Sequence, residues 1–196
     1  ILLQCRDLGA AGRDLLDRQR SDEARRIVDR YTWISAGVVA ATPLPGVDLL
    51  GTAAVNAQMV MEIAAVYGIE LTRQRAQELA VSVGRTLAGL GVVKGGVALI
   101  GTALSVNLPT LLLGRAVQGV AAGWLTRIAG SSFITVFQQD QDWGDGGMQD
   151  VVQHHYELNR RDRSLQEFLQ MALRRVVEPL QQEAKKRLPP VSYTHL

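Results

Sequence analysis

The chain has 196 residues and an almost balanced charge, with 21 basic and 19 acidic side chains. This balance excludes the strongly basic surface of a nucleic-acid-binding domain, and a single cysteine, Cys5, excludes a disulfide framework or a zinc site built from several cysteines. The length allows one domain with an appendage, and 47% apolar residues can bury a sizeable core. Because the chain opens at Ile1 and shows no signal peptide, we expect a fragment of a longer protein.

The charged residues divide the chain into three parts. Thirteen lie in residues 1–30, only ten lie in the 108 positions of 31–138, and the other 17 lie in 139–196. The middle part is therefore an apolar block between polar flanks. This pattern predicts four segments, namely a charged connector helix (1–23), a hydrophobic helical module (24–138), a loop with C-terminal amphipathic helices (139–190) and a non-native tail (191–196).

The apolar block has helical rather than strand periodicity, so we predict an all-α fold, a hydrophobic helical bundle. An apolar stripe predicts a first helix over 24–42, and Pro43-Leu44-Pro45-Gly46 turns it into a helical hairpin. A second helix is predicted over 47–67, ending at Gly68 as a left-handed cap, and Thr72 is suited to cap a third. The stripes of the first and third helices consist of Ala24, Ile27, Val28, Tyr31, Ile34, Ser35 and Val38, and of Ala76, Leu79, Ala80, Val83, Leu87 and Leu90.

Glycine recurs so often in residues 89–101 that a helix there must depend on tertiary contacts or on lipid. Asn107-Leu108-Pro109 predicts the start of a further helix, which continues to about Phe137. The small-residue pairs Gly91/Gly95 and Gly119/Gly123 suit close approach of two helices.

The C-terminal part is predicted to begin with a loop over 140–147 and a short helix over 148–158. A last amphipathic helix follows, for which Ser164 and Glu167 make a possible capping box. Pro179 is expected to kink this helix. Its apolar face consists of Leu165, Phe168, Leu169, Ala172, Leu173, Val176, Leu180 and Ala184.

The apolar block is compatible with a membrane or with a buried core. A spanning helix needs about 20 apolar residues. The arm 31–42 is too short to span alone, although paired with 47–67 it could form a shallow hairpin in the membrane. Arg115 and Arg127 interrupt the later apolar stretch, and each would cost about 2.5–3.5 kcal/mol at the bilayer centre. A soluble bundle with buried central helices is the alternative, and both remain open.

No residue pattern predicts a catalytic, cofactor-binding or metal-binding site in this chain. The glycine run ending at Lys94 lacks the Ser or Thr that a phosphate-binding loop requires. The aspartates of 140–145 fail the calcium-loop pattern, which would need glutamate where Val151 stands. His154 and His155 are adjacent, so on a helix they point about 100° apart, and we expect ordinary surface histidines.

Two groups of residues are predicted to matter for structure. Lone charges on apolar segments need partners, so Glu62 and Lys94 are expected to pair with each other or with Arg115. The second group sets the hairpin turn, with its aspartate capping the helix that follows. It consists of Pro43, Pro45, Gly46 and Asp48.

Several of these motifs together resemble a known family. The turn 43–50 (PLPGVDLL), then Gln58-Met59-Val60 and Ala65-Val66-Tyr67-Gly68-Ile69, is similar to the YcjF-like family, domain of unknown function 697, over about residues 24–135. The flanks, 5–9 and 140–147, resemble cyanobacterial members, in which the domain is a C-terminal module behind an Era-like or dynamin-like GTPase. The resemblance implies that GTP and Mg²⁺ would bind an upstream domain, so no catalytic residue is carried over to this chain.

Our expectation is therefore a non-catalytic, membrane-associating helical module that couples the nucleotide state of an upstream GTPase domain to membrane attachment or self-assembly. The expected partners are that GTPase domain, membrane lipid and a second copy of the chain, and no nucleic acid. The expected location is the cytoplasmic side of a membrane, peripheral or shallowly inserted. The alternative is a soluble cytoplasmic domain for protein–protein interaction or oligomerisation, with the helix 162–188 as its docking surface.

Overall fold

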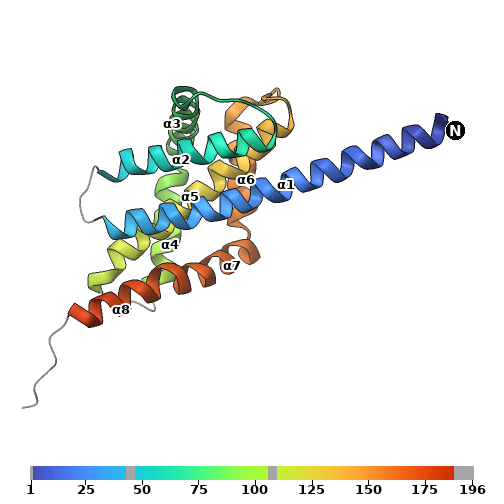
Figure 1. The fold of residues 1–196 in the computed structure, drawn as a ribbon. Helices are drawn as coiled ribbons and strands as arrows, with labels where there is room; N and C mark the ends of the chain where they lie inside the picture. Colours follow the sequence, from blue (N-terminus) through green and yellow to red (C-terminus); the bar gives the residue numbers. More distant parts are fainter. Residues whose placement is uncertain (1, 43–46, 106–109, 188–196) are drawn as a thin grey trace, which may run out of the picture.

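The computed structural model describes residues 2–42, 47–105 and 110–187, and all the regular structure in these ranges is helical. The all-α prediction is therefore confirmed. The elements, shown in Figure 1, are α1 (Leu2–Ala41), α2 (Val47–Val66), α3 (Arg73–Gly89), α4 (Val92–Ser105), α5 (Thr110–Gln138), α6 (Gly147–Arg160), α7 (Asp162–Ala172), the π-helical turn η1 (Leu173–Val177) and α8 (Glu178–Arg187).

Helix α5 is the centre of the bundle. It lies alongside α1, and α2, α4 and α6 pack around it (Figure 1). Its large side chains Trp124, Ile128 and Phe133 are fully buried. The segment Leu113–Gln138 is long and apolar enough to cross a membrane, yet 72% of its most apolar window is buried inside the protein. Most of this helix is apolar because other helices cover most of its surface.

Helix α1 is continuous through the expected boundary between connector and module. Its N-terminal half projects beyond the bundle, and residues 11–20 are all exposed (Figure 1). Burial begins at Ala24, where the predicted stripe begins. The stripe is wrong at its end, because Ile34 and Val38 are 40% and 37% exposed. The division into segments itself stays a prediction.

The contact face of α1 turns toward Ala36 and Ala40 because these small residues meet glycines of α5. A Cβ added to Gly119 would lie 2.6 Å from the Ala36 carbonyl oxygen, and one added to Gly123 would lie 2.9 Å from that of Thr32. Such backbone-to-backbone approach leaves no room for a side chain. The predicted packing role of Gly119 and Gly123 is confirmed.

The other predicted glycine pair does not pack in this way. Gly91 has a φ of +72° in the link between α3 and α4, and a Cβ on Gly95 would meet only the hydroxyl of Tyr156, at 3.7 Å. The close approach on α4 is made by Gly96, where a Cβ would lie 2.5 Å from the Trp124 ring. Helix α4 thus depends on tertiary contact with α5, as its glycine content predicts.

The helix ends of the first half follow the sequence signals. Gly68 has a φ of +75°, and the N–H of Ile69 donates to the Ala64 carbonyl at 2.9 Å, which closes α2 with a left-handed cap. The hydroxyl of Thr72 accepts from the Arg75 N–H at 3.3 Å and caps α3. Both predictions are confirmed. The turn residues Pro43, Pro45 and Gly46, the side chain of Asp48, and Asn107-Leu108-Pro109 lie outside the described residues.

The predicted last helix is continuous over 162–187 as α7, η1 and α8, although it differs from the prediction in two details. Helix α7 begins at Asp162, so Ser164 lies in its first turn, and the predicted capping box is wrong. Glu167 instead accepts from Arg163 at 3.1 Å. The disruption expected at Pro179 takes the form of η1, because proline has no N–H for the carbonyl four residues earlier and a wider turn accommodates its ring. The apolar face packs inward, with the Phe168 ring stacked 5.4 Å from that of Trp33.

Candidate functional site

Glu62 is paired with α1, not with the partners predicted for it. Its carboxylate accepts from the hydroxyl of Tyr31 at 2.5 Å and from the guanidinium of Arg30. The prediction failed because Arg30 stands in the charged flank of the sequence, and only the packing of α1 along α2 brings it beside Glu62. Burial, with the nearby carboxylate, raises the pKa of Tyr31 to about 12, so this phenol keeps its proton at neutral pH.

Arg115 and Lys94 lie in two other places. The Nε of Arg115 donates to the Ala40 carbonyl at 2.9 Å, and its Nη2 donates to that of Ala41 at 3.4 Å. Arg115 therefore satisfies the last carbonyls of α1 and ties this end to α5. Lys94 is exposed on α4. The expected mutual pairing of Glu62, Lys94 and Arg115 is thus wrong.

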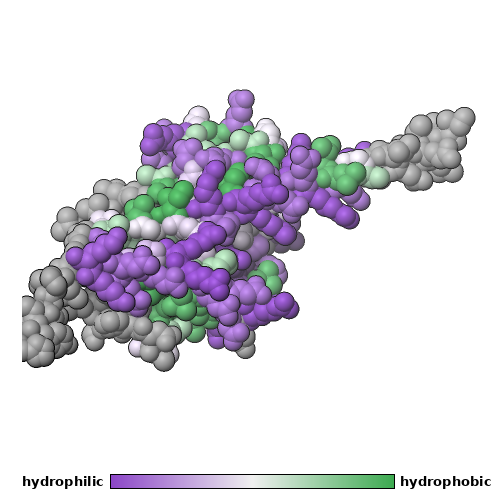
Figure 2. All heavy atoms as spheres, turned by 60° about the horizontal axis from the view of Figure 1, so that its bottom comes forward, coloured by the Kyte–Doolittle hydropathy of each residue, from purple (hydrophilic) through white to green (hydrophobic). Residues whose placement is uncertain are grey.

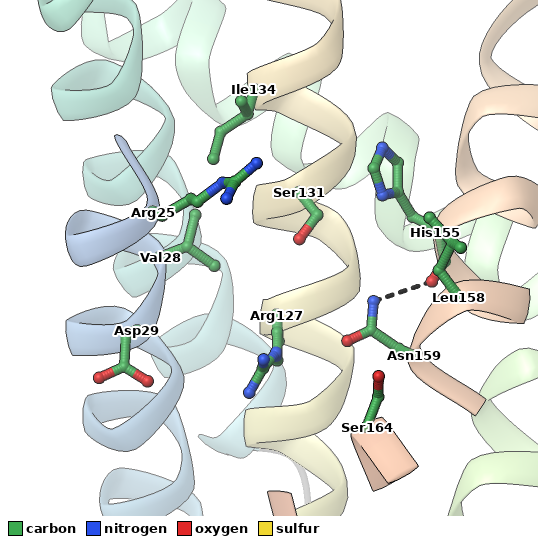
Figure 3. A pocket seen from close by; sticks show the side chains of 10 residues that line it. All are labelled: Arg25, Val28, Asp29, Arg127, Ser131, Ile134, His155, Leu158, Asn159 and Ser164. Atoms are coloured by element: carbon green, nitrogen blue, oxygen red, sulfur yellow. Dashed lines mark hydrogen bonds between the residues drawn. The ribbon is translucent and has the colours of Figure 1, made fainter. Parts of the chain in front are cut away.

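A polar cleft opens between α1, α5, α6 and α7. Its volume is about 460 Å³. Arg25 comes from α1, Arg127 and Ser131 from α5, Asn159 from α6 and Ser164 from α7 (Figure 3). The cleft thus brings together polar groups that are up to 139 positions apart in the sequence.

The cleft contains one acidic side chain, and it is already engaged. Asp29 accepts from the Trp33 indole N–H at 3.2 Å, and its other oxygen lies 4.0 Å from Arg175. Within the described part of the chain, neither Arg25 nor Arg127 has a carboxylate within ion-pair distance. The cleft therefore has an excess of positive charge.

His155 lines the cleft, and both its ring and its backbone carbonyl make hydrogen-bond contacts. Its Nε2 lies 2.8 Å from the Thr135 hydroxyl, and its backbone carbonyl accepts from the Asn159 amide at 2.8 Å. Burial, with a smaller contribution from His154, lowers the pKa of His155 to about 4, so the ring is neutral at pH 7. The prediction of a surface histidine holds for His154, which is exposed, and is wrong for the half-buried His155.

The depressed pKa of His155 predicts a pH-dependent stability. The unfolded chain takes up the proton below about pH 6.5 and the folded chain only near pH 4, so stability present above pH 6.5 is lost as the pH falls toward 4. The slope of the free energy of unfolding from this group is at most about 1.4 kcal/mol per pH unit. Urea unfolding at several pH values measures it. His155→Gln should flatten the slope between pH 6.5 and 4, and His154→Gln should keep most of it; equal slopes in wild type and His155→Gln would contradict the assignment.

A second, apolar cavity of about 320 Å³ lies among α2, α3, α4 and α5. Its polar lining includes Asn56 and Thr126, which bond each other at 3.2 Å. The part of the chain that the structure describes has no group of three His, Cys, Asp or Glu that could hold a metal ion. The polar cleft, with its charged and hydrogen-bonding side chains, is therefore the candidate functional site.

Sequence reasoning missed the cleft because its residues come from separate helices. The one signal available was Arg127, an isolated charge within an apolar stretch. An isolated charge indicates only that a partner is needed, since the identity of that partner depends on which helices come together.

The chain is similar to three bacterial proteins called UPF0283 membrane protein. It is 34% identical over 113 residues to that of Shewanella oneidensis, covering 58% of this chain and 28% of the relative, and 34% identical over 113 residues to that of Vibrio vulnificus, covering 55% and 32%. It is 37% identical over 108 residues to that of Yersinia pestis, covering 54% and 30%. The matched region is thus about a third of the length of these relatives. No solved structure matches the chain.

The model of one protein family matches most of the chain. The match is to a domain of unknown function, DUF697, and it covers residues 3–161. It includes all but the first residue of α1, the hairpin sequence and the whole of α2 to α6. The resemblance to this domain, first indicated by the turn and Tyr-Gly motifs, is confirmed, and the chain belongs to the DUF697 family.

Proposed function

We propose that this chain is a non-catalytic, membrane-associating helical module of a larger protein. The observation that carries the proposal is that similar proteins from three bacteria are named membrane proteins. The family match, residues 3–161, includes the apolar helices of this bundle. The match to the three bacterial proteins covers about a third of their length, so the remainder of the parent protein would supply any catalytic activity.

The burial of α5 favours attachment at the membrane surface over insertion of the whole bundle. A spanning α5 would expose to lipid the faces that now contact α1 and α4, and it would carry Arg115 and Arg127 into the hydrocarbon. Figure 2 shows one face of the molecule, where hydrophilic side chains separate the apolar areas. A surface of this kind suits contact with water or lipid headgroups more than immersion in acyl chains.

One end of the bundle is suited to shallow insertion. The end of α1, the start of α2 and the start of α5 lie together there (Figure 1). The sequences 43–46 and 106–109 that adjoin these elements contain no charged residue. The exposed lysines Lys185 and Lys186 are in the last turns of α8, which reaches the same end, and basic residues beside an apolar segment favour anionic lipid.

The continuity of α1 supports a role in coupling. A single helix runs from Leu2 into the core of the bundle, so a movement of its projecting half would be transmitted to the bundle as a rigid lever. We propose that an upstream GTPase domain, with its GTP and Mg²⁺, attaches through this helix on the cytoplasmic side and controls membrane attachment or self-assembly.

A flotation assay with vesicles of phosphatidylcholine and phosphatidylglycerol tests the membrane proposal. Wild-type protein should float with the vesicles. Ile34→Glu with Val38→Glu places two charges on exposed positions in the bundle half of α1 and should reduce the floating fraction, because charges resist transfer into the interface. The matched control is Leu15→Glu with Leu16→Glu on the projecting half, which should float like wild type. Protein that stays at the bottom with every lipid composition contradicts the proposal.

A second candidate is a soluble domain for interaction or oligomerisation. The docking surface expected on 162–188 is unsuitable, because the apolar face of α7 and η1 is buried against the bundle. The observation that favours this candidate is on α1, where Leu15 and Leu16 are 67% and 54% exposed. If this candidate is right, the Leu15→Glu, Leu16→Glu variant should have a lower molecular mass than wild type, measured by light scattering without detergent. Wild-type protein should then stay at the bottom in the flotation assay.

A further inference from the structure

The polar cleft between α1, α5, α6 and α7 has positive charge that the surrounding residues do not neutralise. Arg25 and Arg127 both line it, and the single carboxylate there, Asp29, is shared with Trp33 and Arg175. Two guanidinium groups that share a cavity repel each other, and a bound anion would relieve this repulsion.

Of the two arginines, Arg127 has the greater need of an anionic partner. It is half-buried on α5, so water hydrates this residue only in part. Neither an ion pair nor a hydrogen bond of this side chain is present among the described residues. A guanidinium in such a position is stabilised when an anion meets it.

Neutral hydrogen-bond donors also line the cleft, beside the apolar Val28, Ile134 and Leu158. The hydroxyls of Ser131 and Ser164 and the amide of Asn159 line it, and the amide uses one of its two hydrogens to bond the His155 carbonyl. His155 itself adds no charge at neutral pH, because burial keeps it neutral. The volume of about 460 Å³ lies within the range typical of small-molecule sites.

We propose that this cleft binds a phosphate group, with Arg25 and Arg127 as its charged ligands and Ser131, Asn159 and Ser164 as neutral donors. Guanidinium groups match the oxygens of phosphate in bidentate geometry. Side-chain hydroxyl and amide donors can satisfy the remaining oxygens.

The position of the cleft favours a soluble phosphate compound over a lipid headgroup. Arg25 precedes the end of α1 at Ala41 by 16 residues, or roughly 24 Å at the helical rise. If that end of the bundle meets the membrane, the cleft lies well above the headgroups. The choice of a soluble compound rests on the proposed membrane attachment, whereas phosphate binding itself does not, since it can be measured without vesicles.

Titration calorimetry with inorganic phosphate at low ionic strength tests the site. Wild-type protein should give a saturable heat. Arg25→Gln and Arg127→Gln should each weaken binding roughly tenfold or more, because each removes a charge-assisted hydrogen bond. Arg25 is exposed, so its variant should fold even if Arg127→Gln is destabilised. The matched control is Arg73→Gln, which makes the same charge change at an exposed position on α3 and should bind phosphate like wild type.

Two results would overturn the proposal, namely no saturable heat with wild type, or equal weakening by Arg73→Gln, which would indicate only general charge attraction. Vesicles with phosphatidylglycerol distinguish the source of the phosphate. A soluble ligand is supported if both arginine variants float like wild type although they no longer bind phosphate. A headgroup is supported if they lose flotation and inorganic phosphate competes with wild-type flotation.

Discussion

Replacing Gly119 by alanine should destabilise the protein, whereas the same replacement at Gly114, on the same helix, should stabilise it. The added methyl group at Gly119 would lie 2.6 Å from the Ala36 carbonyl oxygen and 2.7 Å from the Ala40 Cβ. Neither atom belongs to a flexible side chain, so α1 and α5 must move apart. Overpacking of this kind costs about 1–3 kcal/mol.

Gly114 is the matched control because a Cβ there meets nothing within 4 Å. Alanine has a higher helix propensity than glycine, so Gly114→Ala should gain up to about 1 kcal/mol. Urea unfolding followed by circular dichroism measures both variants. The close approach of α1 and α5 would be refuted if the two variants changed the free energy of unfolding in the same direction. This comparison also tests the interface through which α1 would transmit movement to the bundle.

Phe168→Ala should produce the largest loss of stability among single truncations in the C-terminal part. Phe168 is 1% exposed, and its ring stacks on that of Trp33 with an interplanar angle of 15°. Truncation of a buried phenylalanine costs about 3–5 kcal/mol, because the removed ring leaves a cavity that the surroundings fill only in part. Helix α7 would lose its principal anchor on α1.

The matched control for Phe168→Ala is Gln166→Ala, at an exposed position of the same helix, which should change stability by no more than about 0.5 kcal/mol. Thermal unfolding and limited proteolysis within 161–187 provide the measurements. If Phe168→Ala were as stable and as protease-resistant as Gln166→Ala, the inward packing of α7 would be wrong. That outcome would restore the last helix as an exposed docking surface.

Phe168→Ala and Gly119→Ala should also differ in their effect on the polar cleft. Ser164 lies in the first turn of α7, four residues before Phe168, so the loosening of α7 should weaken phosphate binding as well as stability. Gly119 packs near Ala36 and Ala40, toward the other end of α1, and its effect on the cleft should be smaller. The cleft is thus expected to depend on the C-terminal helices more than on the hairpin half.

Local features of the fold could be predicted because their causes are local. The cap at Gly68 needs a residue that tolerates positive φ, and the cap at Thr72 needs a hydroxyl three residues before an N–H. The failures have causes distant in the sequence. Ile34 and Val38 follow the helical period yet are exposed, because glycines more than 80 positions away draw Ala36 and Ala40 inward.

The candidate site could not be predicted, because its parts are ordinary residues when taken one at a time. Arg25 reads as one charge among many on a solvated helix, and Asn159 and Ser164 lack any motif. The pairing of Glu62 with Arg30, 32 positions earlier, was missed for the same reason. Spacing rules cover contacts within one or two helical turns and do not reach across a bundle.

The sequence by itself determined that this chain is helical, where several of its helices end, and which family it resembles. Helical periodicity, capping residues and a short turn motif are properties of neighbouring positions, so they can be read without coordinates. Tertiary structure alone decided which glycines meet a neighbouring backbone, which carboxylate neutralises which arginine, and that two arginines share a cleft. These depend on how the helices pack, because burial and charge pairing are set by residues that only folding brings together.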